Sequence, residues 1–217
     1  VAVVNRSMTN QPFLLYEYDG TDWTMIAGPG APHQAGLGNP DNYGVAFCCM
    51  FGDKLVLPAF NFTNGIEVWT YDGSSFERIG KAGDPGCWDS SQLLGTVAYS
   101  VLEGKVYMGT TDLDFVTSSG GRLYTYDGSS WSLIVGSGID NTNNCFLSPL
   151  PRGEELYLAT GNLTEGCRVY QRSGSGFSAI SDYGMDGTGN MNALITSYKG
   201  ELITVTSNAN GGQVWTT

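Results

Sequence analysis

Four loops of the sequence each place one aspartate among small polar residues, a pattern that can bind a cation. These aspartates are Asp41, Asp89, Asp140 and Asp186. Their carboxylates and the neighbouring amides offer the oxygen ligands that Ca²⁺ prefers, provided that the fold brings the loops together. None of the loops has the register of an EF-hand, and Asp and Asn also occur in loops because they cap their own turns. The sequence therefore leaves two interpretations open, a calcium site and ordinary turn capping.

Paired carboxylates raise a second kind of chemistry, glycoside hydrolysis. That reaction needs two carboxyl groups roughly 5 to 10 Å apart across a cleft. Asp112 and Asp114, or two of the four loop aspartates, are the residues available for it. Their spacing does not single them out, so we expect no enzymatic activity and keep a carbohydrate-active hydrolase as an alternative.

The single histidine, His33, restricts the remaining mechanisms. Ser-His-Asp catalysis would have to use it, and its Pro- and Gly-rich surroundings do not resemble the setting of a general base. Zinc, copper and iron sites usually draw on several histidines or on thiolate clusters. We therefore expect His33 to be a plain loop residue and assign no catalytic residue.

The five cysteines form a further group. Cys87, Cys145 and Cys167 lie at or beside expected loops and are the candidates for one or two disulfide bonds. Cys48 and Cys49 are expected within a strand, where sequence neighbours point to opposite sides and do not pair with each other. The odd count leaves at least one thiol free or paired elsewhere, and the spacing fits no Cys-x-x-Cys metal motif.

Three Asn-x-Ser/Thr sequons, at Asn5, Asn61 and Asn162, are candidate glycosylation sites. Together with the cysteines and the scarcity of lysine they favour an oxidising, extracellular or cell-surface location. The alternative is that these residues are turn asparagines. The sequence begins at Val1 without the apolar run of a signal peptide, which suggests a processed or partial chain.

Length and charge limit the classes of partner. With 217 residues the chain can form one domain, which we expect to be a single propeller over residues 1–217. The net charge of −11 repels nucleic acid and anionic lipid surfaces. No apolar run reaches the roughly 20 residues that cross a bilayer, so membrane insertion is not expected.

The elements that must position these residues are indicated by a repeat. An aromatic residue, an Asp-Gly pair and a second aromatic recur at intervals of about 45 to 55 residues, a period typical of propeller blades. The copies lie at 15–23, 68–76, 120–131, 169–177 and, truncated, 212–217.

Within one period the pattern predicts four antiparallel strands, seen best at 146–150, 156–160, 167–172 and 177–180. We therefore predict an all-β fold, a β-propeller of four-stranded blades, most simply with five blades of which the two terminal ones each lack a strand. Alternation along the strands predicts two buried faces on each sheet. The long, variable loops share one face of such a fold, and we expect recognition there. They span 27–44, 81–93, 110–121, 136–144 and 181–190.

The repeat resembles kelch-type propellers in its Val-x-x-Tyr-Asp element, as in Val68 to Asp72 followed by Phe76. With its Glu-Val-Trp-x-Tyr-Asp-Gly run it looks even more like the repeats of exported microbial surface propellers. This resemblance implies a non-enzymatic binding, adhesion or structural module with a protein or glycan as partner at the long-loop face. A lectin is an alternative, although it predicts equivalent loops, whereas these differ in length.

Overall fold

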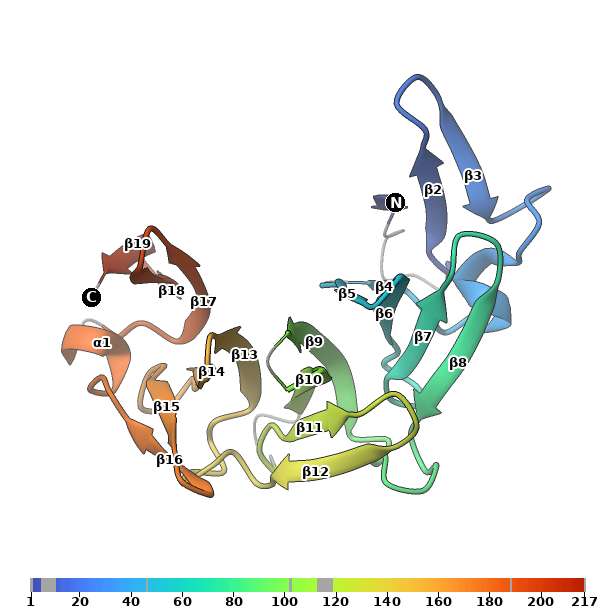
Figure 1. The fold of residues 1–217 in the computed structure, drawn as a ribbon. Helices are drawn as coiled ribbons and strands as arrows, with labels where there is room; N and C mark the ends of the chain where they lie inside the picture. The colour runs from blue at the N-terminus through green and yellow to red at the C-terminus, as the bar shows by residue number, and fades with distance from the viewer. Residues whose placement is uncertain are drawn as a thin grey trace. The chain divides into compact units, whose positions relative to one another are not determined.

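The computed structural model describes residues 2–4, 11–45, 47–101, 103–112, 119–187 and 189–216. These residues form nineteen β-strands, one short 3-10 helix and one helical turn, which confirms the all-β prediction (Figure 1). In the described part, no helix has the length and apolar character needed to cross a membrane. The chain separates into two compact units, Val1–Gly95 and Thr96–Thr217.

The first unit contains two antiparallel sheets and a 3-10 helix in the loop that joins them, η1 (Ala35–Gly38). One sheet consists of β1 (Ala2–Val4), β2 (Leu14–Tyr18) and β3 (Trp23–Ala27), and the other of β4 (Gly44–Val45), β5 (Cys49–Phe51), β6 (Lys54–Phe60), β7 (Glu67–Tyr71) and β8 (Phe76–Lys81). The expected first strand of the second sheet is broken, because β4 and β5 both pair with β6 but are separate strands. Cys48 lies in this break, so the expectation that it is a strand residue was wrong, whereas Cys49 begins β5.

The remaining eleven strands form one sheet. They are β9 (Gln92–Ser100), β10 (Lys105–Asp112), β11 (Leu123–Tyr126), β12 (Trp131–Val135), β13 (Phe146–Arg152), β14 (Glu155–Gly161), β15 (Val169–Ser173), β16 (Gly176–Ala179), β17 (Asn192–Tyr198), β18 (Glu201–Asn208) and β19 (Gly211–Thr216). The first of these strands, β9, begins in the first unit and continues into the second, which contains the other ten. The blades join into one sheet because β10 meets β13 and β14 meets β17 through one residue pair each. The strands at 146–180 agree with the predicted ranges to within two residues.

The Asp-Gly hairpins form as their chemistry requires. In the turn after β7, Asp72 Oδ1 accepts hydrogen bonds from the backbone N–H groups of Ser74 and Ser75, each at 2.8 Å. Gly73 has φ of 96°, a conformation that glycine adopts without strain. In the turn after β11, hydrogen bonds from the side chain and backbone of Ser129 lower the pKa of Asp127 to about 2.

In the three Asp-Gly hairpins, the aromatic residue after the turn packs against the tyrosine before it. Phe76 stacks on Tyr71 with ring centroids 4.4 Å apart, and Trp131 lies 5.0 Å from Tyr126. Trp23 is 57% exposed and lies 5.0 Å from Tyr18, so its ring contacts its own hairpin. The two aromatic rings thus stabilise one hairpin, because the two residues are cross-strand partners.

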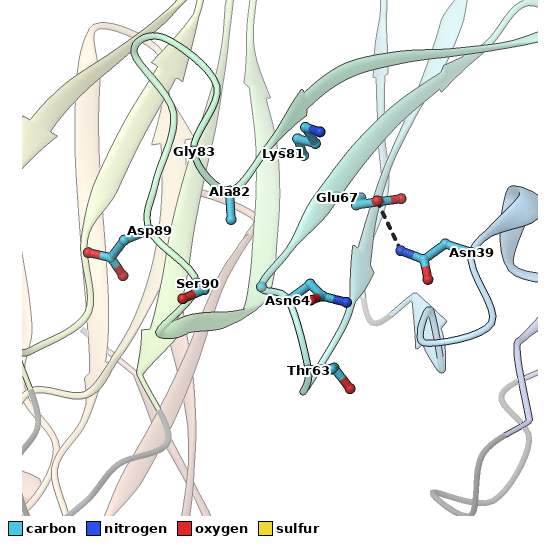
Figure 2. Close-up of a pocket in the computed structure, with 10 residues that line it drawn as sticks. Asn39, Thr63, Asn64, Glu67, Lys81, Ala82, Gly83, Asp89 and Ser90 are labelled. Atoms are coloured by element: carbon cyan, nitrogen blue, oxygen red, sulfur yellow. Dashed lines mark hydrogen bonds between the residues drawn. The ribbon is translucent and has the colours of Figure 1, made fainter.

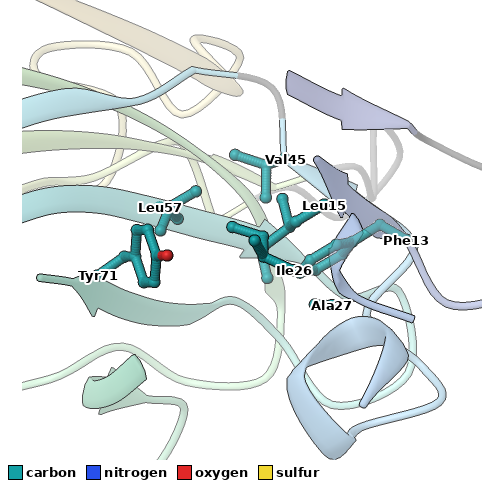
Figure 3. Close-up of a cluster of buried hydrophobic side chains, with 8 residues drawn as sticks. Phe13, Leu15, Ile26, Ala27, Val45, Leu57 and Tyr71 are labelled. Carbon is teal, nitrogen blue, oxygen red and sulfur yellow. The ribbon is translucent and has the colours of Figure 1, made fainter. Parts of the chain in front are cut away.

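Each unit has its own buried core. In the first unit, apolar side chains from both sheets pack together, among them Phe13, Leu15, Ile26 and Leu57 (Figure 3). In the second unit, Tyr107, Leu123, Leu147, Leu158 and Tyr170 form one cluster, and a second cluster lies around β14, β15 and β17. Full burial of one such aliphatic side chain stabilises a fold by about 1.5–3 kcal/mol, so each cluster gives the loops above it a firm base.

Candidate functional site

The loops that connect one blade to the next share a pattern that the sequence reading did not detect. A glycine with φ between 60° and 76° stands six residues before a fully buried amide side chain. The pairs are Gly36 with Asn42, Gly86 with Gln92, Gly138 with Asn144 and Gly184 with Asn190. In three of these loops the amide Nδ2 donates back to the glycine carbonyl, at 2.9, 2.9 and 3.2 Å. The loops are therefore closed by their own side chains.

A second asparagine fastens each of these three loops to the end of a strand. Asn61 Nδ2 donates to Asn42 Oδ1 at 3.1 Å, and Asn162 Nδ2 donates to Asn144 Oδ1 at 3.0 Å. Asn208 makes the same bond to the loop of the last blade, at 2.8 Å. The Oδ1 atoms of these strand-end asparagines accept backbone N–H groups of the turns that follow them. Each pair of amides thus ties a blade-to-blade loop to the turn between the second and third strands.

Two of the three sequon asparagines are members of these pairs. The side chains of Asn61 and Asn162 are fully buried, and each uses its Nδ2 as a donor to another amide. A sugar on that nitrogen would have to replace the hydrogen bond, so glycosylation at either position requires the turn to open. Asn5 lies outside the described residues, and its glycosylation stays a prediction.

The four aspartates proposed as calcium ligands occupy different positions of the loop pattern. Asp41 accepts the amide of Asn64 at 3.2 Å, and Asp89 accepts the backbone N–H of Ser91 at 3.0 Å. Asp140 accepts the Tyr170 hydroxyl at 2.8 Å, and Asp186 lies in the helical turn α1 (Gly184–Gly187). Among the described residues, the structure brings no three His, Cys, Asp or Glu side chains together in a way that suits a metal ion. The calcium site stays a prediction.

All five cysteines lie in the described part of the chain, and each is a free thiol. Cys145 and Cys167 are buried, and burial raises the pKa of each thiol to about 11. Cys87 is half-buried, and burial also raises the pKa of its thiol. The structure thus contains no disulfide bond at any of these three residues. Cys167 packs in the apolar cluster around β14, β15 and β17, and Cys145 Sγ donates to the Gly161 carbonyl at 3.4 Å.

The acidic pair considered for hydrolysis is only partly described. Asp112 is 3% exposed, and its Oδ2 accepts the N–H and the hydroxyl of Ser119 at 3.0 and 2.8 Å. Asp114 lies outside the described residues. The Asp112 carboxylate therefore holds the loop between β10 and β11 through its hydrogen bonds to Ser119.

The first unit contains a polar pocket of about 600 Å³ at the loop face. Three loops line it, those after β3, β6 and β8, as expected for loops that share one face (Figure 2). The lining residues are Asn39, Thr63, Asn64, Gly65, Glu67, Lys81, Ala82, Gly83, Asp89 and Ser90. We call this site the polar pocket.

Glu67 is the most buried carboxylate of the polar pocket, at 8% exposure. Its carboxylate accepts Asn39 Nδ2 at 3.0 Å, Asn42 Nδ2 at 2.9 Å and Trp69 Nε1 at 3.3 Å. Arg78 adds a charge partner at 4.0 Å. These donors fix the carboxylate at the pocket wall while leaving further acceptor capacity on its oxygens. Figure 2 shows Glu67 and Asp89 on different walls of the pocket.

The equivalent place in the second unit is filled by the protein itself. Counted from the equivalent aromatics Phe76 and Phe177, Glu67 corresponds to Arg168 and Ala82 corresponds to Tyr183. Arg168 Nε donates to the Ser181 carbonyl at 2.9 Å. The Tyr183 ring lies against the Arg168 guanidinium, 4.3 Å from its centroid, and its hydroxyl accepts Asn141 Nδ2 at 3.3 Å.

In the first unit this place holds the small side chain of Ala82, and at the next residue, Gly83, an added Cβ would meet nothing within 4 Å. The polar pocket is thus open because Ala82 stands where the second unit has Tyr183. Sequence reasoning missed this site because it treated Glu67 as part of the repeated scaffold. Alignment of these two loops on the hairpin aromatics Phe76 and Phe177 would have revealed the substitution.

Comparisons with known proteins identify the fold. No family model and no curated protein matches the sequence. A protein of unknown function from Dyadobacter fermentans is similar in structure, with a TM-score of 0.60 and 11% identity over 97% of this chain and 69% of that one. An exo-β-1,3-galactanase from Phanerochaete chrysosporium has a TM-score of 0.58 at 11% identity, over 79% of this chain and 46% of that one. An α-L-arabinofuranosidase from Clostridium thermocellum has a TM-score of 0.51 at 14% identity, over 94% and 74%.

These glycoside hydrolases of family 43 are five-bladed β-propellers, and the chain has the same fold, which confirms the prediction of five blades. The chain spans about half the length of the galactanase. At 10 to 15% identity the likeness shows the fold alone. The resemblance to kelch repeats gains no support from these comparisons.

Proposed function

We propose that the protein is a non-enzymatic binding module that takes a small polar ligand in the polar pocket. The observation that carries this proposal is the open space beside Ala82, where the repeat in the second unit places Tyr183. An emptied repeat position, walled by fixed amides and a fixed carboxylate, has the features of a preformed ligand site. Export to the cell surface belongs to the proposal because the repeats resemble those of exported propellers.

The carboxylates of the polar pocket support binding over catalysis. Glu67 is held by three N–H donors, two from the loop after β3 and one from its own strand, and Asp89 accepts the backbone N–H and the hydroxyl of Ser91. Both groups therefore have structural partners that a reacting carboxyl group would have to give up. Together with Asn39, Asn64 and Lys81 they offer acceptors and donors to a ligand that carries several hydroxyl groups.

The test is to block the polar pocket with Ala82→Trp and to compare it with Thr21→Trp, which adds the same ring to an exposed hairpin. Both are screened by ¹H–¹⁵N correlation spectra against a panel of monosaccharides, polyols, amino acids and nucleotides. We expect shifts at 63–67 and 81–90 with at least one ligand in the parent and in Thr21→Trp, and none in Ala82→Trp. A panel without any such shift, or shifts that persist in Ala82→Trp, would contradict the proposal.

A glycoside hydrolase is the second candidate. It is favoured by the fold of the structural neighbours, whose names describe hydrolysis of galactans and arabinofuranosides, and by two carboxylates, Glu67 and Asp89, in one pocket. A hydrolase predicts that the parent releases sugar from galactan, arabinan or xylan and that Glu67→Gln and Asp89→Asn do not. A parent without detectable release removes this candidate.

A further inference from the structure

A second depression, of about 350 Å³, lies beside the polar pocket in the first unit and has aromatic walls. Its lining residues are Pro32, His33, Gln34, Leu37, Gly38, Trp69 and Phe76. The rings of His33 and Phe76 meet edge to face with centroids 4.9 Å apart, and His33 Nε2 lies 3.1 Å from the Ser74 carbonyl. We call this depression the aromatic groove. His33, expected to be a plain loop residue, is thus part of its wall.

The aromatic groove and the polar pocket are contiguous. Glu67 of the pocket and Trp69 of the groove are alternate residues of β7, so their side chains share one face of the strand. The indole Nε1 of Trp69 donates to Glu67 Oε2 at 3.3 Å, so the two sites meet at this hydrogen bond. Gly38 of the groove and Asn39 of the pocket are consecutive in sequence. A ligand longer than one ring can therefore occupy both sites.

We propose that this composite site binds a neutral oligosaccharide of at least two sugar units, one in the polar pocket and the next in the aromatic groove. The inference rests on the proposed function and names its ligand class. A sugar has hydroxyl groups at its edges, which match the amides and carboxylates of the pocket, and an apolar C–H face, which packs against aromatic rings.

The charge of the chain argues against a nucleotide, which also combines polar groups with a planar ring. In the polar pocket, Glu67 and Asp89 are matched by Lys81 and by Arg78, which pairs with Glu67. The pocket thus has no excess of positive charge for the phosphates of a nucleotide, which the net charge of −11 on the chain repels. A neutral saccharide brings no charge that the pocket would have to neutralise.

The test compares matched pairs of probes by isothermal titration: galactose with β-1,3-galactotriose, xylose with xylotriose, and arabinose with arabinotriose. We expect the trisaccharide of at least one pair to bind about tenfold more tightly than its monosaccharide, because the groove adds an aromatic contact. His33→Ala, in a loop outside the polar pocket, should reduce this advantage and leave monosaccharide binding in place. Trp69→Ala should remove the advantage and should also weaken monosaccharide binding, because its indole holds Glu67. Thermal unfolding of both variants verifies that they fold.

Equal affinity for monosaccharide and trisaccharide, or an advantage that survives in both variants, would overturn the inference. The proposed function would then still stand if the monosaccharide binds the parent and fails to bind Ala82→Trp. If no probe sugar binds, the oligosaccharide inference is wrong. The correlation spectra with amino acids, polyols and nucleotides then test the proposed function by themselves.

Discussion

Asn162 and its partner Asn144 show how a buried amide side chain holds a loop of this protein in place. Asn162 donates to Asn144 with its Nδ2 and accepts the N–H groups of Thr164 and Glu165 with its Oδ1. It therefore satisfies one buried acceptor and two backbone donors. An amide is suited to this position because it carries both a donor and an acceptor, which a carboxylate does not.

Replacing Asn162 with Ala should lower the free energy of unfolding by about 2–3 kcal/mol, because it leaves buried polar groups without their partners. Urea denaturation measures the change, and Asn143→Ala serves as the control, since Asn143 is exposed in the same loop region. The control should change stability by no more than about 0.5 kcal/mol. Similar losses in both variants would show that the amide pair does not stabilise the fold.

At the scale of elements, the blade-to-blade loops decide where the polar pocket forms. They share a glycine, a buried amide and an apolar residue next to the glycine, such as Leu37 or Ile139, which packs on the core below. Both of these apolar residues have positive φ, at 56° and 74°. The strain is tolerated because each side chain gains burial and the loop is held by its amide.

Glycine at the start of such a loop should be far less replaceable than glycine in a hairpin. Gly138 and Gly153 have φ of 71° and 59°, so alanine at either position carries a similar conformational cost of about 1–2 kcal/mol. A Cβ at Gly138 would lie 2.1 Å from the Asn141 carbonyl oxygen, whereas one at Gly153 meets nothing within 4 Å.

Gly138→Ala should therefore cost at least about 3 kcal/mol and Gly153→Ala about 1–2 kcal/mol, measured by urea denaturation. The difference isolates the clash from the backbone strain. Equal costs would show that the loop can relax around a methyl group.

At the scale of the whole molecule, cysteine accessibility reports on cooperative unfolding in the second unit. Burial raises the pKa of Cys145, Cys167 and Cys48 alike, but Cys145 and Cys167 are buried from solvent whereas Cys48 is exposed. Iodoacetamide at pH 8 should modify Cys48 in the native protein and should reach Cys145 and Cys167 only on unfolding, as mass spectrometry of the peptides can follow. Unfolding without reductant should expose all five thiols. A pair that stays unmodified there would reveal a disulfide bond and contradict the free thiols of the structure.

Both units also place polar side chains at corresponding loop positions, and in the first unit the space beside Ala82 is open. The Arg168 guanidinium and the Tyr183 ring occupy the matching place in the second. A repeat fold thus supplies several equivalent positions, and single residues decide which of them can accept a ligand.

The sequence alone determined the repeat, the strands and the hairpins, because these depend on local chemistry. Asp72 with Gly73 specifies a turn whose hydrogen bonds lie within four residues, and alternation in β7 specifies its two buried faces. Tertiary structure decided the roles of Asn61, Glu67 and His33, because their partners are remote in sequence. Asn42 lies nineteen residues before Asn61, and Asn39 lies 28 residues before Glu67. Ser74 lies 41 residues after His33, and only the packing of loops over the core brings such groups within hydrogen-bonding distance.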